Sequence, residues 1–323
     1  MGLEEFGDGK NKYRKRRNLT DECKEVSTCP EPIAGEESIS EGKKLRRSQW
    51  SVVGSSVYLA TSLSVKKLPP AVYSFATSNS GVLFVESPTQ SDEIISFSDS
   101  IFDNVVEEVE NFWLLTDEFV KYGFLHKRGY LFYGPAGGGK SCLVQRIVRD
   151  VISKDGLAFI CSLRPSLVSD ALKAFREVEP DRKMVCIFED IDAIIDAWAE
   201  SDVLSLLDGE NQVDGVINLA TTNYPEKLDK RIVGRPRRFD RIIKIDMPNE
   251  RVREEYLKKK LRFNGADLEK WVKASEGFSF ASLADLVISV ECFKNSFDES
   301  VKILKDLSKK YSSSEFEEAN VGF

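Results

Sequence analysis

The residues best suited to chemistry stand together at 134–141, where the sequence is Gly-Pro-Ala-Gly-Gly-Gly-Lys-Ser. They fit the pattern GxxxxGK[ST], in which small residues let backbone N–H groups wrap a phosphate. The Lys140 ammonium would meet the β- and γ-phosphates, and the Ser141 hydroxyl would bind Mg²⁺. The pattern therefore predicts a nucleoside triphosphate site. Its expected contacts are Gly134, Pro135, Ala136, Gly137, Gly138, Gly139, Lys140, Ser141 and Cys142.

Two adjacent carboxylates, Glu189 and Asp190, follow the apolar run Met184–Phe188. Successive side chains of a strand point in opposite directions, so the two acids cannot share one role. One would hold Mg²⁺ and the other would orient the attacking water. Asp192, close behind them, either supports the Mg²⁺ site or caps the next helix.

The elements that must position these residues follow from periodicity. Short apolar runs alternate with helical patterns from about Asp99, which predicts an α/β fold with a doubly wound parallel sheet. The phosphate loop lies between a strand and a helix, so the N-terminal dipole of that helix faces the anion. After Pro248 only helical periodicity remains, which predicts an all-helical C-terminal lobe. The expected core strands are Tyr130–Tyr133, Ala158–Leu163, Met184–Phe188, Val216–Ala220 and Ile242–Ile245, and the expected C-terminal helices are Arg251–Leu261, Phe280–Phe293 and Glu299–Leu307.

The N-terminal third differs from the core in composition. Its first part is polar and charged in blocks, which is typical of a flexible arm. Short runs of β-branched and aromatic residues follow and predict a small β-rich domain. The expected boundaries are an arm at 1–48, the β-rich domain at 49–98, the α/β core at 99–248, a helical lid at 249–312 and a tail at 313–323.

Composition limits the classes of function. The net charge of the 323 residues is −7, which argues against a protein that coats nucleic acid without specificity. No window approaches the roughly 18 consecutive apolar residues of a membrane span. Six cysteines are too few for a disulfide scaffold, so we expect a reducing cytoplasm. Four of them, which we expect to be buried thiols, are Cys142, Cys161, Cys186 and Cys292. The single histidine, His126, is interpreted as a surface or turn residue.

These motifs, in this order, resemble the AAA family of P-loop ATPases, within the wider AAA+ group, over about residues 99–307. Asn223 falls on the position that senses the γ-phosphate, after the strand Val216–Ala220. The segment 235–241, Arg-Pro-Arg-Arg-Phe-Asp-Arg, is similar to the signature RPGRFDR. The resemblance makes Arg238 and Arg241 arginine fingers that reach the site of a neighbouring subunit. It implies ATP and Mg²⁺ as cofactors.

The resemblance also assigns finer roles. It gives Glu189 the Mg²⁺ position and Asp190 the catalytic one. It places Gly123 where family members contact the adenine, and it lays the helix opened by Gly277–Ser279 over that base. The sequence Lys127–Leu131 and the Glu-Asp order are similar to the branch of the mitochondrial Rieske-protein translocase, which carries a membrane helix that we do not expect here.

Some positions depart from the family pattern. Asp190 is one methylene shorter than the usual glutamate, which brings the water closer or slows hydrolysis. Arg237 replaces a glycine beside the fingers, and Gly137–Gly139 make the loop more flexible than usual. The segment Leu163–Leu167 lacks the aromatic pore motif of relatives that thread polypeptide.

Two functions stay open at this point. The first is an ATPase ring, of six subunits by the same resemblance, that remodels a protein or nucleic-acid partner. The second is an oligomeric assembly protein that ATP switches and that hydrolyses slowly, which the short Asp190 and the missing pore motif favour. A loader or helicase on DNA would need a basic channel, which the sequence cannot locate.

Overall fold

A computed structural model describes residues 49–52, 57–61, 65–78, 81–88, 100–198, 200–208, 212–229, 232, 237–261 and 266–310. The arm expected at 1–48 and the tail expected at 313–323 lie outside these residues. So do Arg235 and Pro236 of the signature segment. No helix of the described part is long and apolar enough to cross a membrane.

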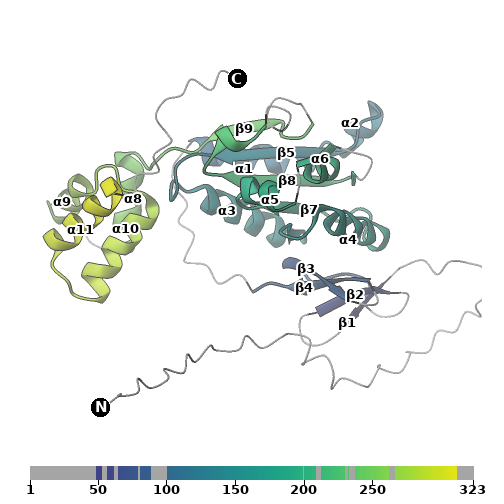
Figure 1. The fold of residues 1–323 in the computed structure, drawn as a ribbon, viewed down its shortest axis with the longest axis horizontal. Helices are drawn as coiled ribbons and strands as arrows, with labels where there is room; N and C mark the ends of the chain where they lie inside the picture. Colours follow the sequence, from purple (N-terminus) through teal and green to yellow (C-terminus); the bar gives the residue numbers. More distant parts are fainter. Residues whose placement is uncertain are drawn as a thin grey trace, which may run out of the picture. The chain divides into compact units, whose positions relative to one another are not determined.

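Nine strands of the described residues form one sheet in the order β1-β2-β4-β3-β6-β7-β8-β5-β9 (Figure 1). From β3 to β9 in this order every pair of neighbouring strands runs parallel, whereas the pairs β1–β2, β2–β4 and β4–β3 are antiparallel. Each core strand overlaps the run expected from the sequence, although β5 begins three residues earlier and β6 ends at Ile160 rather than at Leu163. The α/β class is confirmed. The bounds are β1 Gln49–Val52, β2 Val57–Thr61, β3 Val72–Ser78, β4 Gly81–Glu86, β5 Lys127–Tyr133, β6 Leu157–Ile160, β7 Met184–Phe188, β8 Val216–Thr222 and β9 Arg241–Lys244.

The N-terminal strands are β-rich, as expected, but they do not form a sheet of their own. β3 pairs in parallel with β6, with Val72 opposite Ala158, so β1–β4 extend the core sheet. The edge of β6 would otherwise present unpaired backbone groups, and β3 satisfies them. The expectation of an independent domain at 49–98 is therefore corrected to an extension of the core.

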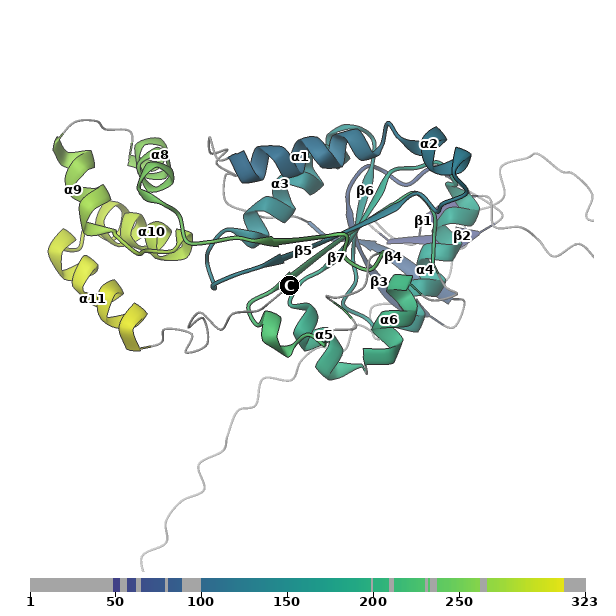
Figure 2. The same ribbon diagram turned by 90° about the horizontal axis from the view of Figure 1, so that it is seen from above.

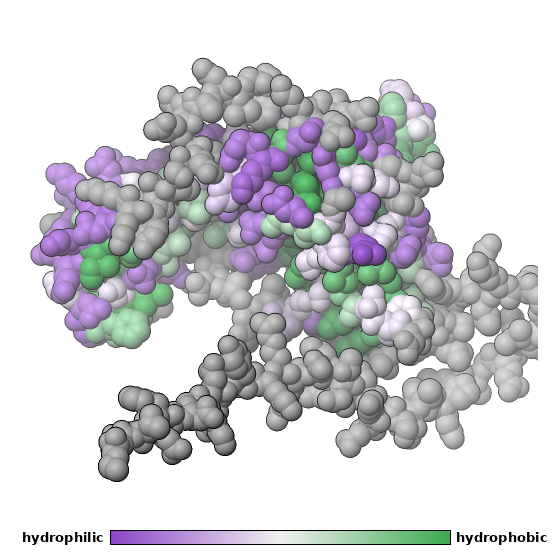
Figure 3. All heavy atoms as spheres, in the orientation of Figure 1, coloured by the Kyte–Doolittle hydropathy of each residue, from purple (hydrophilic) through white to green (hydrophobic). Residues whose placement is uncertain are grey.

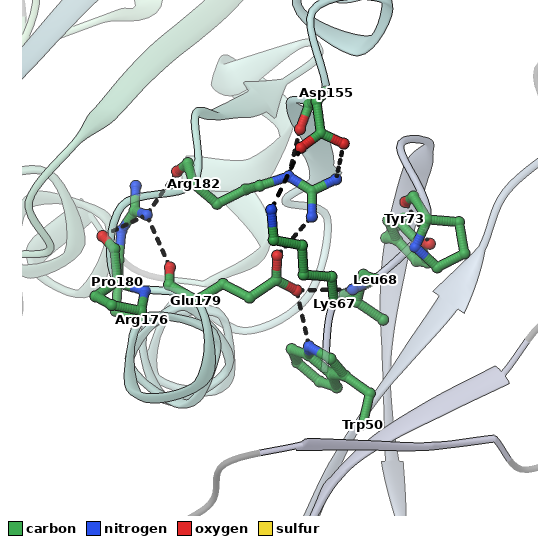
Figure 4. A network of polar contacts seen from close by, with 10 residues as sticks. Trp50, Lys67, Leu68, Tyr73, Asp155, Arg176, Glu179, Pro180 and Arg182 are labelled. Atoms are coloured by element: carbon green, nitrogen blue, oxygen red, sulfur yellow. Dashed lines mark hydrogen bonds and ion pairs between the residues drawn. The ribbon is translucent and has the colours of Figure 1, made fainter. Parts of the chain in front are cut away.

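A buried carboxylate joins this extension to the core. Glu179, at the end of α4 (Pro165–Val178), accepts hydrogen bonds from the Trp50 indole at 2.8 Å and from the Leu68 N–H at 2.8 Å. Its other oxygen accepts from Arg182 at 2.6 Å. Figure 4 shows these groups converging on the carboxylate, with Asp155 on the far side of Arg182. Three donors thus depend on one buried side chain.

Helices cover both faces of the sheet. α1 (Ser100–Phe112) and α3 (Lys140–Ser153) lie on one face, and α4, α5 (Ile191–Ala197) and α6 (Glu200–Asp208) lie on the other (Figure 2). Successive side chains of β7 point to opposite faces of the sheet. Val185 and Ile187 pack on the side of α3, and Cys186 and Phe188 pack on the side of α4. The buried Cys161 and Cys186 agree with the expectation of buried thiols.

The C-terminal lobe is helical, as expected. It consists of α8 (Glu250–Leu261), α9 (Ala266–Ala274), α10 (Phe280–Val287), a π-helical turn (Ile288–Cys292) and α11 (Phe297–Lys310). α9 was not expected, although its Trp271 is buried in the core of the lobe. Cys142 is half-buried, and Cys292 is exposed, because the π-helical turn carries its side chain away from that core.

Candidate nucleotide site

The phosphate loop leaves β5 at Tyr133 and enters α3 at Lys140. Three of its glycines adopt positive φ angles: 145° at Gly134, 74° at Gly137 and 110° at Gly139. Side chains resist this conformation, so glycine is required where the loop turns. Gly139 is also the N-cap of α3, which directs the first free N–H groups of the helix toward the loop. The backbone thus forms a cradle suited to an anion.

Lys140 is buried inside this cradle. Its ammonium donates to the carbonyl oxygens of Gly134 at 2.8 Å and Pro135 at 2.9 Å, and to Asn223 Oδ1 at 2.6 Å. Burial lowers the pKa of Lys140, and the charge of Asp190 opposes that shift. All three acceptors are neutral, so a phosphate would offer the ammonium a stronger, charged partner. The lysine and the predicted sensor are already in contact.

The two acids lie at the end of β7, beside β8. Burial raises the pKa of Glu189, and the neighbouring charge of Asp190 raises it further. Asp190 is the N-cap of α5 with a left-handed backbone, at φ 46°. Its N–H donates to Thr221 Oγ1 at 3.1 Å, which holds this conformation. The backbone thus turns sharply at Asp190, between the end of β7 and the start of α5.

The two alternatives for Asp192 can be compared with its contacts. Asp192 lies in the first turn of α5, and its carboxylate accepts from the Thr222 hydroxyl at 2.6 Å. The Thr222 oxygen accepts in turn from the Tyr224 N–H at 2.9 Å. Both Asp192 and Thr222 are buried. Together they fix the strand end that carries Asn223. Sequence reasoning missed Thr222, although a hydroxyl immediately before the sensor was a usable signal.

The helical lobe contacts the loop directly. The Phe280 N–H donates to the Gly137 carbonyl at 3.0 Å, and Ser279 caps α10 by accepting from the Ser282 N–H. Between lobe and loop lies a cavity of about 410 Å³. Its lining includes Ile101, Phe102, Gly138, Ile245, Met247 and Phe280. The cavity also borders Asp246 and Asn249, and a cavity with apolar walls and a few polar groups beside the loop is of a kind that accepts a base.

The placement of Gly123 at the adenine is not supported by this geometry. Gly123 precedes β5, whereas the loop follows that strand. A seven-residue strand spans about 23 Å, so Gly123 and the loop lie at opposite ends of the sheet. Gly123 does not line the cavity at Gly138 either. Gly123 is close to the loop in the sequence, but the length of β5 separates the two in space.

The two proposed fingers lie in different settings. Arg238 is buried, and its Nε donates to Asp208 of the same chain at 2.6 Å. Arg241 is half-exposed, with its Nε 3.5 Å from Glu108 Oε2. Arg241 is paired with Tyr130, four residues before the loop, or about 13 Å along the strand. Neither arginine therefore lies at the phosphate cradle of its own chain.

Two further expectations can be compared with the structure. His126 is not a surface residue: its ring stacks on Phe112 with centroids 3.9 Å apart, and its Nε2 lies 2.8 Å from the Phe112 carbonyl. The segment equivalent to a pore loop is short, because Pro165 already begins α4. Arg164 before it lies 5.6 Å over the Trp198 ring.

Comparisons with known proteins agree with this geometry. A profile of the ATPase family associated with various cellular activities (AAA) matches residues 130–247. Proteasome-activating nucleotidases from Methanococcus maripaludis strains S2 and C6 are each 31% identical over 188 residues. These matches cover 51% of this chain and 45% of the relatives. The chain thus spans less than half the length of the curated relatives it matches.

Proposed function

We propose, from the premise that residues 130–247 are an ATPase domain of the AAA family, that the whole chain hydrolyses ATP and assembles into a ring. The observation that carries this proposal is the buried Lys140, which joins the glycine cradle to Asn223. A basic group held at 2.6 Å from a neutral amide is poised to exchange that contact for a phosphate.

The residues of the cradle and those at the two strand ends have different proposed roles. Gly134–Gly139 would hold the phosphates through backbone N–H groups, and Lys140 would neutralise their charge. Ser141 and Glu189 would hold Mg²⁺, which would polarise the phosphate oxygens when bound. Asp190 would orient the attacking water, and Asn223 would hold it close to the γ-phosphate.

The third part of the proposal is that a second copy completes each site. Arg238 and Arg241 lie along β5 and β9, away from the loop of their own chain. We assign them to the site of a neighbouring subunit, where their charge would stabilise the transition state. Hexameric assembly and the remodelling of a protein or nucleic-acid partner are parts of the same proposal.

Complementation between two variants tests the shared site. Lys140→Ala should lose nucleotide binding but keep its fingers, whereas Arg241→Ala should keep binding but lose turnover. An equal mixture should therefore recover part of the ATPase activity that neither variant has alone. Mixtures that stay inactive, together with a parent turnover that does not depend on protein concentration, would refute shared sites.

The catalytic assignment has its own test. Asp190→Asn should bind a fluorescent ATP analogue with the parent affinity and turn over at least about a hundredfold more slowly. Asp196→Asn, the same chemical change at an exposed position of α5, is the matched control and should hydrolyse ATP normally. Normal turnover by Asp190→Asn would show that another group orients the water.

The slow, ATP-switched assembly protein stays the second candidate because of one contact. Arg238 is buried in an ion pair with Asp208 of its own chain, so it must leave this pair to act in a neighbour. A chain that keeps the pair would assemble around ATP with little turnover. Steady-state ATPase assays over a range of protein concentrations distinguish the candidates, because only the motor gains substantial turnover on assembly.

A further inference from the structure

Asp190, which is assigned to the attacking water, occupies a position where an aspartate ordinarily has another task. It is the N-cap of α5. An aspartate there commonly adopts an extended backbone, and its carboxylate accepts a hydrogen bond from an N–H of the first turn. Asp190 instead has φ 46° and ψ 59°, and its side chain makes no capping hydrogen bond to α5. The helix therefore leaves this carboxylate available for other contacts.

The neighbouring strand holds the backbone of Asp190. β7 ends at Phe188, so Asp190 lies beyond the ladder that joins β7 to β8. Its N–H donates instead to the Thr221 hydroxyl of β8 at 3.1 Å. Thr221 is 3% exposed and lies opposite Phe132 of β5, the strand that leads into the phosphate loop. One buried residue thus lies between that strand and the turn at Asp190.

Alternation along β8 places the Thr221 hydroxyl on the side of the phosphate loop. Leu219 packs with the residues of α3, so Thr221, two positions later, points to the same face of the sheet. α3 is the helix into which the loop leads. Thr222 points to the opposite face, where its hydroxyl donates to Asp192. The two adjacent threonines therefore hold different parts of the site, and Thr221 holds the turn at Asp190.

The carboxylate of Asp190 lies within reach of both the loop and solvent. Burial lowers the pKa of Lys140, and the charge of Asp190 acts against this shift, so the two groups are close enough to interact. Asp190 is exposed. In Figure 1 α5 lies in front of the sheet, and Figure 3 shows hydrophilic residues in that part of the surface. A group that orients a water beside the phosphates requires access of this kind.

We propose that Thr221 is a positioning residue for ATP hydrolysis. Its hydroxyl holds Asp190 in the left-handed turn, which keeps the carboxylate off α5 and available to the attacking water. Without this acceptor, Asp190 can relax to an extended backbone and cap the helix, because a left-handed backbone is disfavoured and the cap is not. Aspartate suits the turn because it is enriched in left-handed conformations, whereas glutamate is not. This inference rests on the proposed function and gives a reason for the aspartate at this position.

Thr221→Val tests the proposal, because valine has the shape of threonine and lacks the acceptor. We expect kcat for ATP to fall about three- to tenfold, the effect of one neutral hydrogen bond. The KM for ATP and the affinity for a fluorescent ATP analogue should stay close to those of the parent. Thr221→Ser keeps the hydroxyl and should recover most of the lost kcat. Thr77→Val, the same change at an exposed position of β3, is the matched control and should behave like the parent.

A double variant separates positioning from general damage to the fold. Thr221→Val added to Asp190→Asn should cause no further loss of kcat, because the group that Thr221 positions is already gone. Losses that multiply in the double variant would overturn the inference and leave the ATPase proposal standing. So would a Thr221→Val protein that hydrolyses ATP at the parent rate.

A variant that leaves Thr221 intact gives an independent result. Asp190→Glu lengthens the side chain but fits the left-handed turn less well, so its kcat should fall below that of the parent. Faster hydrolysis by Asp190→Glu would overturn the inference, even if Thr221→Val did not fold. A parent that fails to hydrolyse ATP would instead refute the proposed function, and the inference with it.

Discussion

Substituting Gly137 by alanine isolates the contact between the helical lobe and the phosphate loop. Gly137 has a φ of 74°, and a Cβ there would lie 2.8 Å from both Cβ and Oγ of Ser279. Gly123 has nearly the same φ, at 70°, with nothing within 4 Å of its own Cβ position. The pair therefore separates backbone strain, which both positions share, from the steric conflict with the lobe, which only Gly137 has.

The expected magnitudes follow from these two situations. A left-handed alanine is disfavoured by about 1–2 kcal/mol, which is the whole loss expected for Gly123→Ala. Gly137→Ala adds the overlap with Ser279, about 1–3 kcal/mol, and weakens the Phe280 N–H bond to the Gly137 carbonyl, about 1 kcal/mol. We expect a total loss of about 3–6 kcal/mol at Gly137. Chemical denaturation of the two variants and the parent would measure the difference.

Nucleotide affinity and a second substitution complete the test. Gly137→Ala should bind a fluorescent ATP analogue at least about tenfold more weakly, because the lobe can no longer approach the loop, whereas Gly123→Ala should bind normally. Ser279→Gly removes both atoms in conflict, and glycine remains an acceptable N-cap, so it should restore part of the loss in the double variant. Equal losses at both glycines, without rescue, would refute the reasoning.

The remaining predictions concern the polar groups. Glu179→Ala should lower the free energy of unfolding by about 3–5 kcal/mol, because it leaves the N–H donors of Trp50 and Leu68 without this acceptor and removes one of the two carboxylates that pair with the buried Arg182. Glu179→Gln should lose clearly less, and equal losses in denaturation would contradict this. Desolvation and the neighbouring charge of Asp190 raise the pKa of Glu189, so its carboxyl takes up a proton at a higher pH than an ordinary glutamate does. Mg²⁺ affinity should therefore weaken in mildly acidic solution in the parent but not in Glu189→Gln. Burial lowers the pKa of Lys127 from 10.5 to about 8. Between pH 8 and pH 10.5 the unfolded chain therefore binds more protons at this lysine than the folded chain does. The free energy of unfolding should rise with pH over this range in the parent and not in Lys127→Met.

The core of the fold was predictable because its signals are local. The strand Met184–Phe188 is apolar at every position since both of its faces are covered, and its predicted bounds match β7. The phosphate loop was predictable for the same reason, because its glycine pattern and the strand and helix beside it are all adjacent in the sequence. By contrast, the pairing of β3 with β6 joins Val72 to Ala158 across the chain, and no local pattern specifies which strand a free edge will accept.

The side-chain settings that sequence reasoning missed all depend on distant partners. His126 is buried because Phe112 and Trp113 pack around it, although two basic residues, Lys127 and Arg128, follow it directly in the sequence. Arg238 is buried because Asp208, thirty residues earlier, accepts from it. A motif predicts which residue types occur together, whereas burial and ion pairing depend on the strands that bring remote segments into contact.

The glycine triplet illustrates how the structure changes the meaning of a departure from the family pattern. The sequence alone suggests a more flexible loop. In the fold, a Cβ at Gly139 would lie 3.0 Å from the Phe280 ring, and one at Gly138 would lie 3.2 Å from the carbonyl oxygens of Ile245 and Asp246. The bare backbone is therefore enclosed on two sides by its own chain. Small residues here serve close packing of the lobe and of β9 against the loop, so the position of the lobe and the shape of the phosphate cradle are set by the same contacts.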